Sequence, residues 1–104
     1  RGIMNANTGQ TRTEVLNEAN DLINGDRNVD YGAPNDDFRK TAGMWDIYLK
    51  SVYEPRDHLL PHDVAVLMSM LKLSRIAWSP DRRDNWVDLA GYAACGWDCV
   101  ENTY

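Results

Sequence analysis

The sequence contains few of the residues that mark fibrous, linker-like or disulfide-rich proteins. It has seven glycines, four prolines and two cysteines in 104 residues. The two cysteines, Cys95 and Cys99, are four residues apart in a predicted helix, where a disulfide would strain the helical geometry. We therefore expect both to be reduced, small buried residues of a cytoplasmic protein.

Long hydrophobic runs and clusters of basic residues are also missing. The longest apolar run, Val64 to Met70, is far shorter than the ~20 residues that span a bilayer, and no signal-peptide pattern is visible. Eleven Lys and Arg against sixteen Asp and Glu give a net charge of −5. An acidic chain of this kind is a poor binder of DNA or RNA polymers, although a local phosphate pocket is compatible with it. We expect neither a membrane nor a nucleic-acid polymer as partner.

The pattern that is present is helical. The hydrophobic fraction of 43% and the charged fraction of 26% are typical of one globular domain. We predict a loose N-terminal arm over residues 1–10 and a single all-α domain over residues 11–104. No segment has the alternating pattern of a strand.

Four helices are predicted. A capping box, Thr11 to Glu14, opens the first, which ends at Asn24-Gly25 and is followed by a loop over residues 26–33. The other three helices run from Pro34 to the Glu54-Pro55 break, from Pro61 to about Trp78, and from about Arg83 to about Asn102; the two starting prolines suit a first helical turn.

The third of these helices is apolar on every side in its first half, so it should be buried all round. Burial of that kind is difficult in a monomer of 104 residues. We therefore expect a bundle completed by oligomerisation into a dimer or tetramer. Small residues in the last helix would allow close approach of helices: Ala90, Gly91, Ala93, Ala94 and Gly96.

Three carboxylates, Glu14, Glu18 and Asp21, line one side of the first helix. One interpretation is an ordinary solvated face. The other is a site for a hard cation, because Mg²⁺ binds carboxylate oxygens together with water and phosphate.

Opposite charges on the last two helices suggest a second polar site. Asp84 can complement the positive N-terminal end of its helix, but Asp88 lies beyond the first turn among apolar residues and needs a partner. Lys72 and Arg75 near the preceding helix end can stabilise that end, pair with Asp84 or Asp88, or bind a phosphate. We predict an ion pair between Asp88 and Lys72 or Arg75.

The remaining candidates are aromatic residues and histidines. Tyr31-Gly32 is either a plain turn or the place where an aromatic ring stacks on a base. His58 and His62 are four residues apart, but Pro61 prevents a continuous helix between them, so we interpret both as surface residues. No phosphate loop, dinucleotide fingerprint or zinc-binding spacing is found.

Four stretches occur in an order that resembles small phage and prophage proteins of unknown function. They are residues 16–21 (LNEAND), 27–32 (RNVDYG), 72–75 (KLSR) and 84–92 (DNWVDLAGY). This group looks related to the MazG-like all-α nucleotide pyrophosphohydrolases and to a phage nucleotide-modification-associated domain. The resemblance covers about residues 12 to 98.

The resemblance implies a Mg²⁺-dependent enzyme that cleaves nucleoside triphosphates to monophosphates and pyrophosphate in the cytoplasm of the host cell. The catalytic and metal-binding residues would be Glu18, Asp21 and Asp88. The nucleotide-binding residues would be Arg27, Tyr31, Lys72, Arg75, Asn85 and Tyr92. In this chain Asn17 and Asn85 stand where the two metal motifs begin with glutamate.

Three functional hypotheses follow. The retained Glu18, Asp21 and Asp88 favour the enzyme. The loss of two carboxylates, at Asn17 and Asn85, favours a protein that captures a nucleotide without turnover, for example a cyclic or modified immune signal. The third is a structural phage protein whose charged residues serve helix packing.

Overall fold

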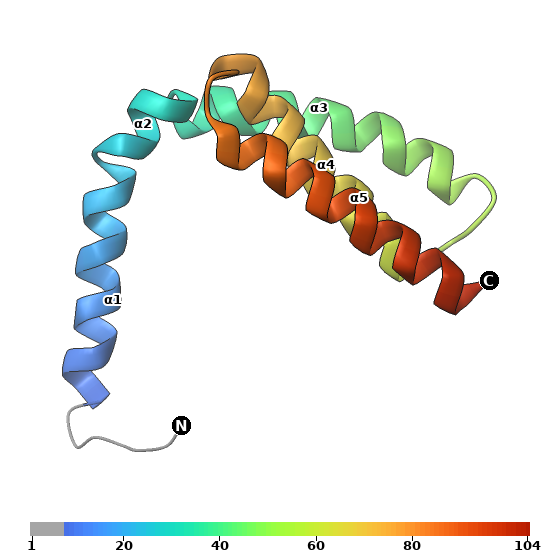
Figure 1. The fold of residues 1–104 in the computed structure, drawn as a ribbon, viewed down its shortest axis with the longest axis horizontal. Coiled ribbons are helices and arrows are strands. Elements are labelled where there is room, and N and C mark those ends of the chain that lie inside the picture. The colour runs from blue at the N-terminus through green and yellow to red at the C-terminus, as the bar shows by residue number, and fades with distance from the viewer. Residues whose placement is uncertain (1–7) are drawn as a thin grey trace.

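The computed structural model describes the backbone of residues 8–104 and the side chains of residues 10–25 and 29–104. The described chain is all-helical and has no strand, which confirms the predicted class (Figure 1). None of its helices is long and apolar enough to cross a membrane. The helices are α1 (Thr8–Ile23), α2 (Asp26–Tyr31), α3 (Pro34–Tyr53), α4 (Pro61–Trp78) and α5 (Arg83–Thr103).

Two predicted boundaries differ from the structure. The helix α1 begins at Thr8, inside the predicted arm, while residues 1–7 lie outside the described part of the chain. The predicted loop at residues 26–33 is wrong, because most of it forms α2. Contacts from the α4–α5 turn hold this short helix: Trp78 Nε1 donates to the Val29 carbonyl over 3.3 Å, and the Ser79 hydroxyl donates to the Asp30 carbonyl.

A single glycine separates α2 from α3. Gly32 is buried and has a φ of 81°, in the left-handed region that favours glycine. A Cβ at this position would lie 3.5 Å from the indole ring of Trp78. The residue therefore sets the turn between the two helices and packs directly against the end of α4.

Polar contacts join α3 to α4 along their length. Trp45 Nε1 donates to the Leu67 carbonyl over 2.7 Å, and Lys40 Nζ donates to the Ser74 carbonyl over 3.0 Å. On the other side of α4, Gly96 brings α5 close, since a Cβ there would lie 3.1 Å from that of Ala65. This contact supports the predicted role of small residues at Gly96, whereas Gly91 has no such neighbour within 4 Å.

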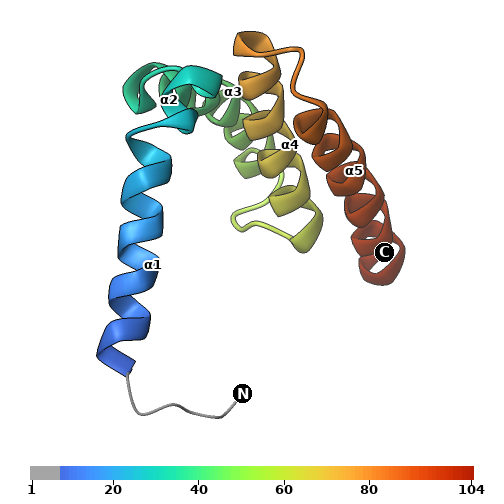
Figure 2. The same ribbon diagram turned by 60° about the vertical axis from the view of Figure 1, so that its left-hand side comes forward.

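These contacts produce a layer of helices in which α4 lies between α3 and α5. Both views show this arrangement, and α3 and α5 make no contact with each other in the described chain (Figures 1 and 2). Helix α1 contacts α2 alone among the described helices and stands apart from the layer. A four-helix bundle is therefore not formed within the described part of one chain.

The layer leaves much apolar surface uncovered. Among the described side chains, the buried hydrophobic residues are Val52, Ala65 and Leu67, whereas Val64 and Leu73 of α4 are 55% and 45% exposed. Within one chain α3 and α5 cover two sides of α4, and completion of its burial by a second copy stays a prediction. The radius of gyration is 17.4 Å, against about 13 Å for a compact protein of this length.

The cysteines lie on the outer part of the layer. Cys95 is exposed and Cys99 is half-buried, and both are free thiols. The expectation that both are small buried residues is wrong for Cys95. It lies on α5, where no further helix covers it in the described chain.

Candidate functional site

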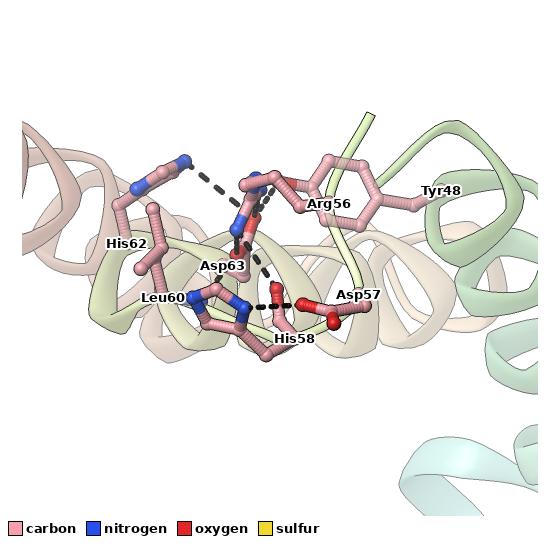
Figure 3. Close-up of polar contacts among 7 residues, drawn as sticks. All are labelled: Tyr48, Arg56, Asp57, His58, Leu60, His62 and Asp63. Atoms are coloured by element: carbon pink, nitrogen blue, oxygen red, sulfur yellow. Dashed lines mark hydrogen bonds and ion pairs between the residues drawn. The ribbon is translucent and has the colours of Figure 1, made fainter. Parts of the chain in front are cut away.

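Each end of α4 carries a polar cluster, and the first surrounds Asp63 (Figure 3). The Asp63 side chain is fully buried. Arg56 donates to it twice, from Nη1 to Oδ2 over 2.8 Å and from Nη2 to Oδ1 over 3.0 Å. The Tyr48 hydroxyl donates to Oδ1 over 2.5 Å, and the Leu60 backbone N–H donates to Oδ2 over 2.7 Å.

These bonds define the charge state of the cluster. The hydrogen bonds from Arg56 hold the pKa of the Asp63 carboxyl well below its usual range, with further help from Tyr48 and Leu60. Burial and the hydrogen bond to Asp63 raise the pKa of Tyr48 to about 12. Asp63 is therefore an ionised carboxylate whose two oxygens already accept hydrogen bonds, and these bonds hold the turn between α3 and α4. Sequence reasoning missed it, although an acid at the third position after Leu60 is a local capping signal.

The two histidines behave differently. His58 is exposed as predicted, with Nδ1 2.8 Å from the Asp57 carboxylate. His62 was predicted to be a surface residue, but its side chain is only 19% exposed and its Nε2 lies 3.5 Å from Asp63 Oδ1. The Nδ1 atom of His62 is buried without a hydrogen-bond partner among the described residues. Packing of α5 and Tyr104 beside it explains the burial.

The second cluster lies toward the C-terminal end of α4 and contains most of the predicted nucleotide-binding residues. Lys72 Nζ is 3.0 Å from Asp88 Oδ2, which confirms the predicted ion pair between these helices. The Lys72 side chain is 12% exposed and that of Asp88 is 47% exposed. Asp88 therefore lies at the open edge of the layer rather than inside it.

Arg75 takes a different partner from those considered in the sequence. Its guanidinium carbon lies 4.6 Å from the centroid of the Tyr31 ring, a cation–π contact between α4 and α2. Its Nε is 3.9 Å from Oδ2 of Asp37, a fully buried carboxylate on α3. At that distance the two charges attract each other, but the buried Nε has no hydrogen-bond partner among the described residues.

Asn85 supplies a second unpaired donor. Its side chain is 1% exposed, and its Nδ2 has no hydrogen-bond partner in the described chain. Asn85 precedes Asp88 by one turn, and α4 and α5 run antiparallel (Figure 1), so Asn85 is level with the turn of α4 that follows Lys72. A buried donor without an acceptor costs about 1–3 kcal/mol, so two at one end of a helix pair require an explanation.

The other predicted residues lie elsewhere. Tyr92 lines an apolar cavity of about 290 Å³ between α4 and α5, together with His62 and Trp97. Asp84 lines a polar cavity of about 240 Å³ with Asp30, Tyr31 and Arg82. The side chain of Arg27 lies outside the described residues.

The carboxylates proposed for Mg²⁺ are separated within one chain. Glu18 and Asp21 are exposed on α1, which does not contact α4 or α5. Among the described side chains, no group of three or more His, Cys, Asp or Glu residues is close enough to hold a metal ion. One chain by itself therefore does not fit a metal site made of Glu18, Asp21 and Asp88.

The fold and site define an all-helical protein with unpaired hydrogen-bond donors on an open helical layer. The chain belongs to the family DUF6378, a domain of unknown function, whose model matches residues 14–100. It is 37% identical over 90 residues to the Gene 55 protein of Mycobacterium phage D29, covering 86% of this chain and 53% of the phage protein.

A second relative, the Gene 55 protein of Mycobacterium phage L5, is 37% identical over 79 residues, covering 76% of this chain and 47% of the relative. The chain thus spans about half the length of the curated relatives that it matches. No solved structure matches the chain.

Proposed function

We propose that this chain is a MazG-like nucleotide-binding protein of phage type that acts on free nucleotides in the host cytoplasm. The observation that carries the proposal is the pair of buried donors, Arg75 Nε and Asn85 Nδ2, that have no acceptor in the described chain. Phosphate oxygens are strong acceptors for donors of this kind. The phage origin of the relatives supports the setting.

Each residue of the cluster then has a chemical role. Arg75 and Lys72 supply positive charge to the phosphates, and the Asn85 amide donates to a phosphate oxygen. Tyr31, held against Arg75 by the cation–π contact, packs on the base. Asp37 behind Arg75 holds the guanidinium by charge attraction at 3.9 Å.

The reaction that we propose is cleavage of a nucleoside triphosphate to monophosphate and pyrophosphate with Mg²⁺. Mg²⁺ would neutralise the phosphates, with Glu18, Asp21 and Asp88 as its protein ligands. One chain does not bring these three carboxylates together, so the reaction requires an arrangement in which α1 reaches the layer. We derive no chemical step through the metal for the single chain.

Capture without turnover is the second candidate, and the Lys72–Asp88 ion pair favours it. A carboxylate with a lysine ammonium 3.0 Å away is already neutralised and is a weaker metal ligand. Asn17 and Asn85 also favour capture, because they are neutral where the metal motifs have glutamate. In this case the protein would hold a nucleotide, such as a cyclic or modified immune signal, and release it unchanged.

Calorimetric titration of nucleoside triphosphates, with and without Mg²⁺, tests the proposal. We expect Arg75→Gln and Asn85→Ala to weaken binding at least about tenfold, the value of one charge-assisted hydrogen bond. Arg39→Gln, a change at an exposed arginine of α3, is the matched control. Binding that is unchanged in both cluster variants would contradict the proposed site.

The same samples distinguish the two candidates. Pyrophosphate release that requires Mg²⁺ and disappears in Glu18→Ala and Asp88→Ala would establish the enzyme. Tight binding that ignores Mg²⁺ and survives both substitutions would establish capture.

A further inference from the structure

The apolar side of α1 is uncovered in the structure. Its larger hydrophobic residues are all more than half exposed: Val15 (62%), Leu16 (68%), Leu22 (55%) and Ile23 (51%). With Ala19 they form one stripe at helical spacing. Because α1 contacts α2 alone among the described helices, α3, α4 and α5 cover none of this stripe.

A matching apolar surface lies on the layer. Phe38, Thr41, Ala42 and Trp45 of α3 and Leu71 of α4 line an apolar groove of about 330 Å³. Helical spacing places Val64 and Met68 of α4 on the same side of the layer, followed by Lys72 and Arg75. We call this side, from Phe38 and Leu71 to Arg75, the Lys72 face.

The exposed area is large enough for a stable dimer. The chain has an accessible surface of 7479 Å², whereas a compact monomer of 11.9 kDa exposes about 6,000 Å². The excess of about 1,500 Å² is greater than the ~800 Å² that each partner buries in a standard protein interface. A single helical layer also lacks the second layer that domains use to enclose a core.

The contacts of α2 direct α1 away from its own layer. Trp78 binds the Val29 carbonyl, and Arg82 forms an ion pair with Asp30. Together with the Arg75–Tyr31 contact, they hold α2 on the C-terminal end of α4, and α1 leaves from there without contacting the layer (Figures 1 and 2). A second copy of the chain can therefore cover both the apolar stripe of α1 and the Lys72 face.

The charges are complementary as well. Glu18 borders the apolar stripe of α1, and Glu14 and Asp21 lie further round the helix, away from the stripe. The Lys72 face ends in two cations, Lys72 and Arg75. An α1 helix that packs its apolar stripe on the groove can place Glu18 beside these cations.

We propose that two copies of this chain exchange their α1 helices, so that α1 of each copy packs on the Lys72 face of the other. The exchange is two-fold symmetric, because each copy both donates an α1 and offers a face. It buries the two apolar surfaces that one chain leaves open. As a consequence that rests on the proposed function, Glu18 of one copy borders the site formed by Lys72, Arg75 and Asp88 of the other.

Light scattering on the full chain measures the oligomeric state. We expect twice the 11.9-kDa chain mass for the wild type, and a halved mass for the Leu16→Asp/Leu22→Asp variant and for Phe38→Asp. Ile47→Asp changes an apolar residue that is 71% exposed and falls on the other side of α3, so it should leave the dimer intact. A monomeric wild type, or a dimer broken by Ile47→Asp alone, would overturn the proposal.

Cross-linking tests the exchange without depending on a destabilised variant. In a Cys95→Ser/Cys99→Ser background, a chain carrying both Leu22→Cys and Phe38→Cys is treated with a short bismaleimide. Exchange predicts a covalently linked dimer. A linked monomer would show that α1 folds back on its own layer, and no link at all would show that α1 packs elsewhere; both results overturn the proposal.

Mixing of variants separates the interface from the proposed function. Glu18→Ala and Asp88→Ala chains are each expected to lack pyrophosphate release. In a mixed dimer, one of the two sites combines the intact Asp88 of one chain with the intact Glu18 of the other, so half of the sites should be active. Recovery on mixing supports the shared site. Dimers that exchange subunits without recovery would reject the shared site and leave the interface in place.

Discussion

The charged clusters at the two ends of α4 differ in how fully their main groups are hydrogen-bonded. At the N-terminal end, the buried carboxylate of Asp63 accepts hydrogen bonds from Arg56, Tyr48 and the Leu60 backbone. At the other end, Arg75 Nε and Asn85 Nδ2 are buried donors without an acceptor in the described chain. The hydrogen bonds of the first cluster stabilise the α3–α4 turn. The unpaired donors of the second cluster lower the stability of the free protein, and a ligand that accepts hydrogen bonds from them would offset this loss.

The difference shows how a structural polar cluster can be distinguished from a binding one. Burial and charge are common to both ends, so neither property identifies the function. The hydrogen-bonding state of the principal groups does. Asp63 has its acceptors in use, and among the described residues only His62 Nδ1 is left without a partner beside it. Arg75 and Asn85, in contrast, both have unused donors that a phosphate could engage. This comparison can be tested by substitutions at each end.

The largest effect is expected at Asp63. Asp63→Ala leaves the Arg56 guanidinium without its carboxylate and should lower the free energy of unfolding by about 3 kcal/mol. Asp88→Ala, which breaks an ion pair with a 47% exposed carboxylate, should cost less than about 1 kcal/mol. Urea denaturation of both variants measures the difference, and equal midpoints would remove the structural distinction between the two ends.

Acid should act through the same carboxylate. The folded-state pKa of Asp63 lies below its unfolded-state value of about 3.9, so its stabilisation is complete above about pH 4 and is lost as the pH falls below that value. We expect the wild type to lose more stability than Asp63→Asn between about pH 4 and pH 2. Parallel curves of the free energy of unfolding against pH would contradict this assignment.

At the other end, a substitution should stabilise the protein while it damages the site. Asn85→Leu replaces a buried unpaired amide by an apolar group of similar volume and should raise the free energy of unfolding by about 1 kcal/mol. Nucleotide binding should fall at the same time. A destabilised Asn85→Leu variant would indicate that the amide is satisfied in the folded protein.

An effect of similar size is expected at Tyr48. Its folded-state pKa of about 12 lies above the ordinary value of 10.0, so its stabilisation is complete below pH 10 and is lost as the pH rises toward 12. Tyr48→Phe should cost about 1 kcal/mol at neutral pH and should remove this alkaline loss. Thermal unfolding between pH 9 and pH 12 provides the comparison, and an identical alkaline loss in both proteins would assign it to other groups.

The long helices could be predicted from local signals. Pro34 and Pro61 mark helix starts, and apolar spacing defines the stretches that became α3, α4 and α5. Helix α2 could not, because its six residues lack an apolar stripe and are held by Trp78 and Ser79 from 49 positions away. Local pattern does not contain such distant contacts.

The candidate site could likewise be predicted from the sequence only in part. The Lys72–Asp88 pair could be predicted because both residues lie on neighbouring helices at positions that need partners. The stacking of Arg75 on Tyr31 and the burial of Asn85 depend on how three helices meet, so the sequence alone does not specify them. The metal assignment at Glu18, Asp21 and Asp88 stays a prediction.

The turn at Gly32 has a mechanical consequence. Helix α1 has 16 residues and is therefore about 24 Å long, and α2 joins it to this turn. A change of about 10° in the direction of α1 moves its far end by roughly 4 Å, close to the spacing between successive turns of a helix. Because Trp78 and Ser79 hold α2 against the layer, the Gly32 turn sets the place from which α1 departs, and a side chain at this position would disturb both the turn and the contact with Trp78.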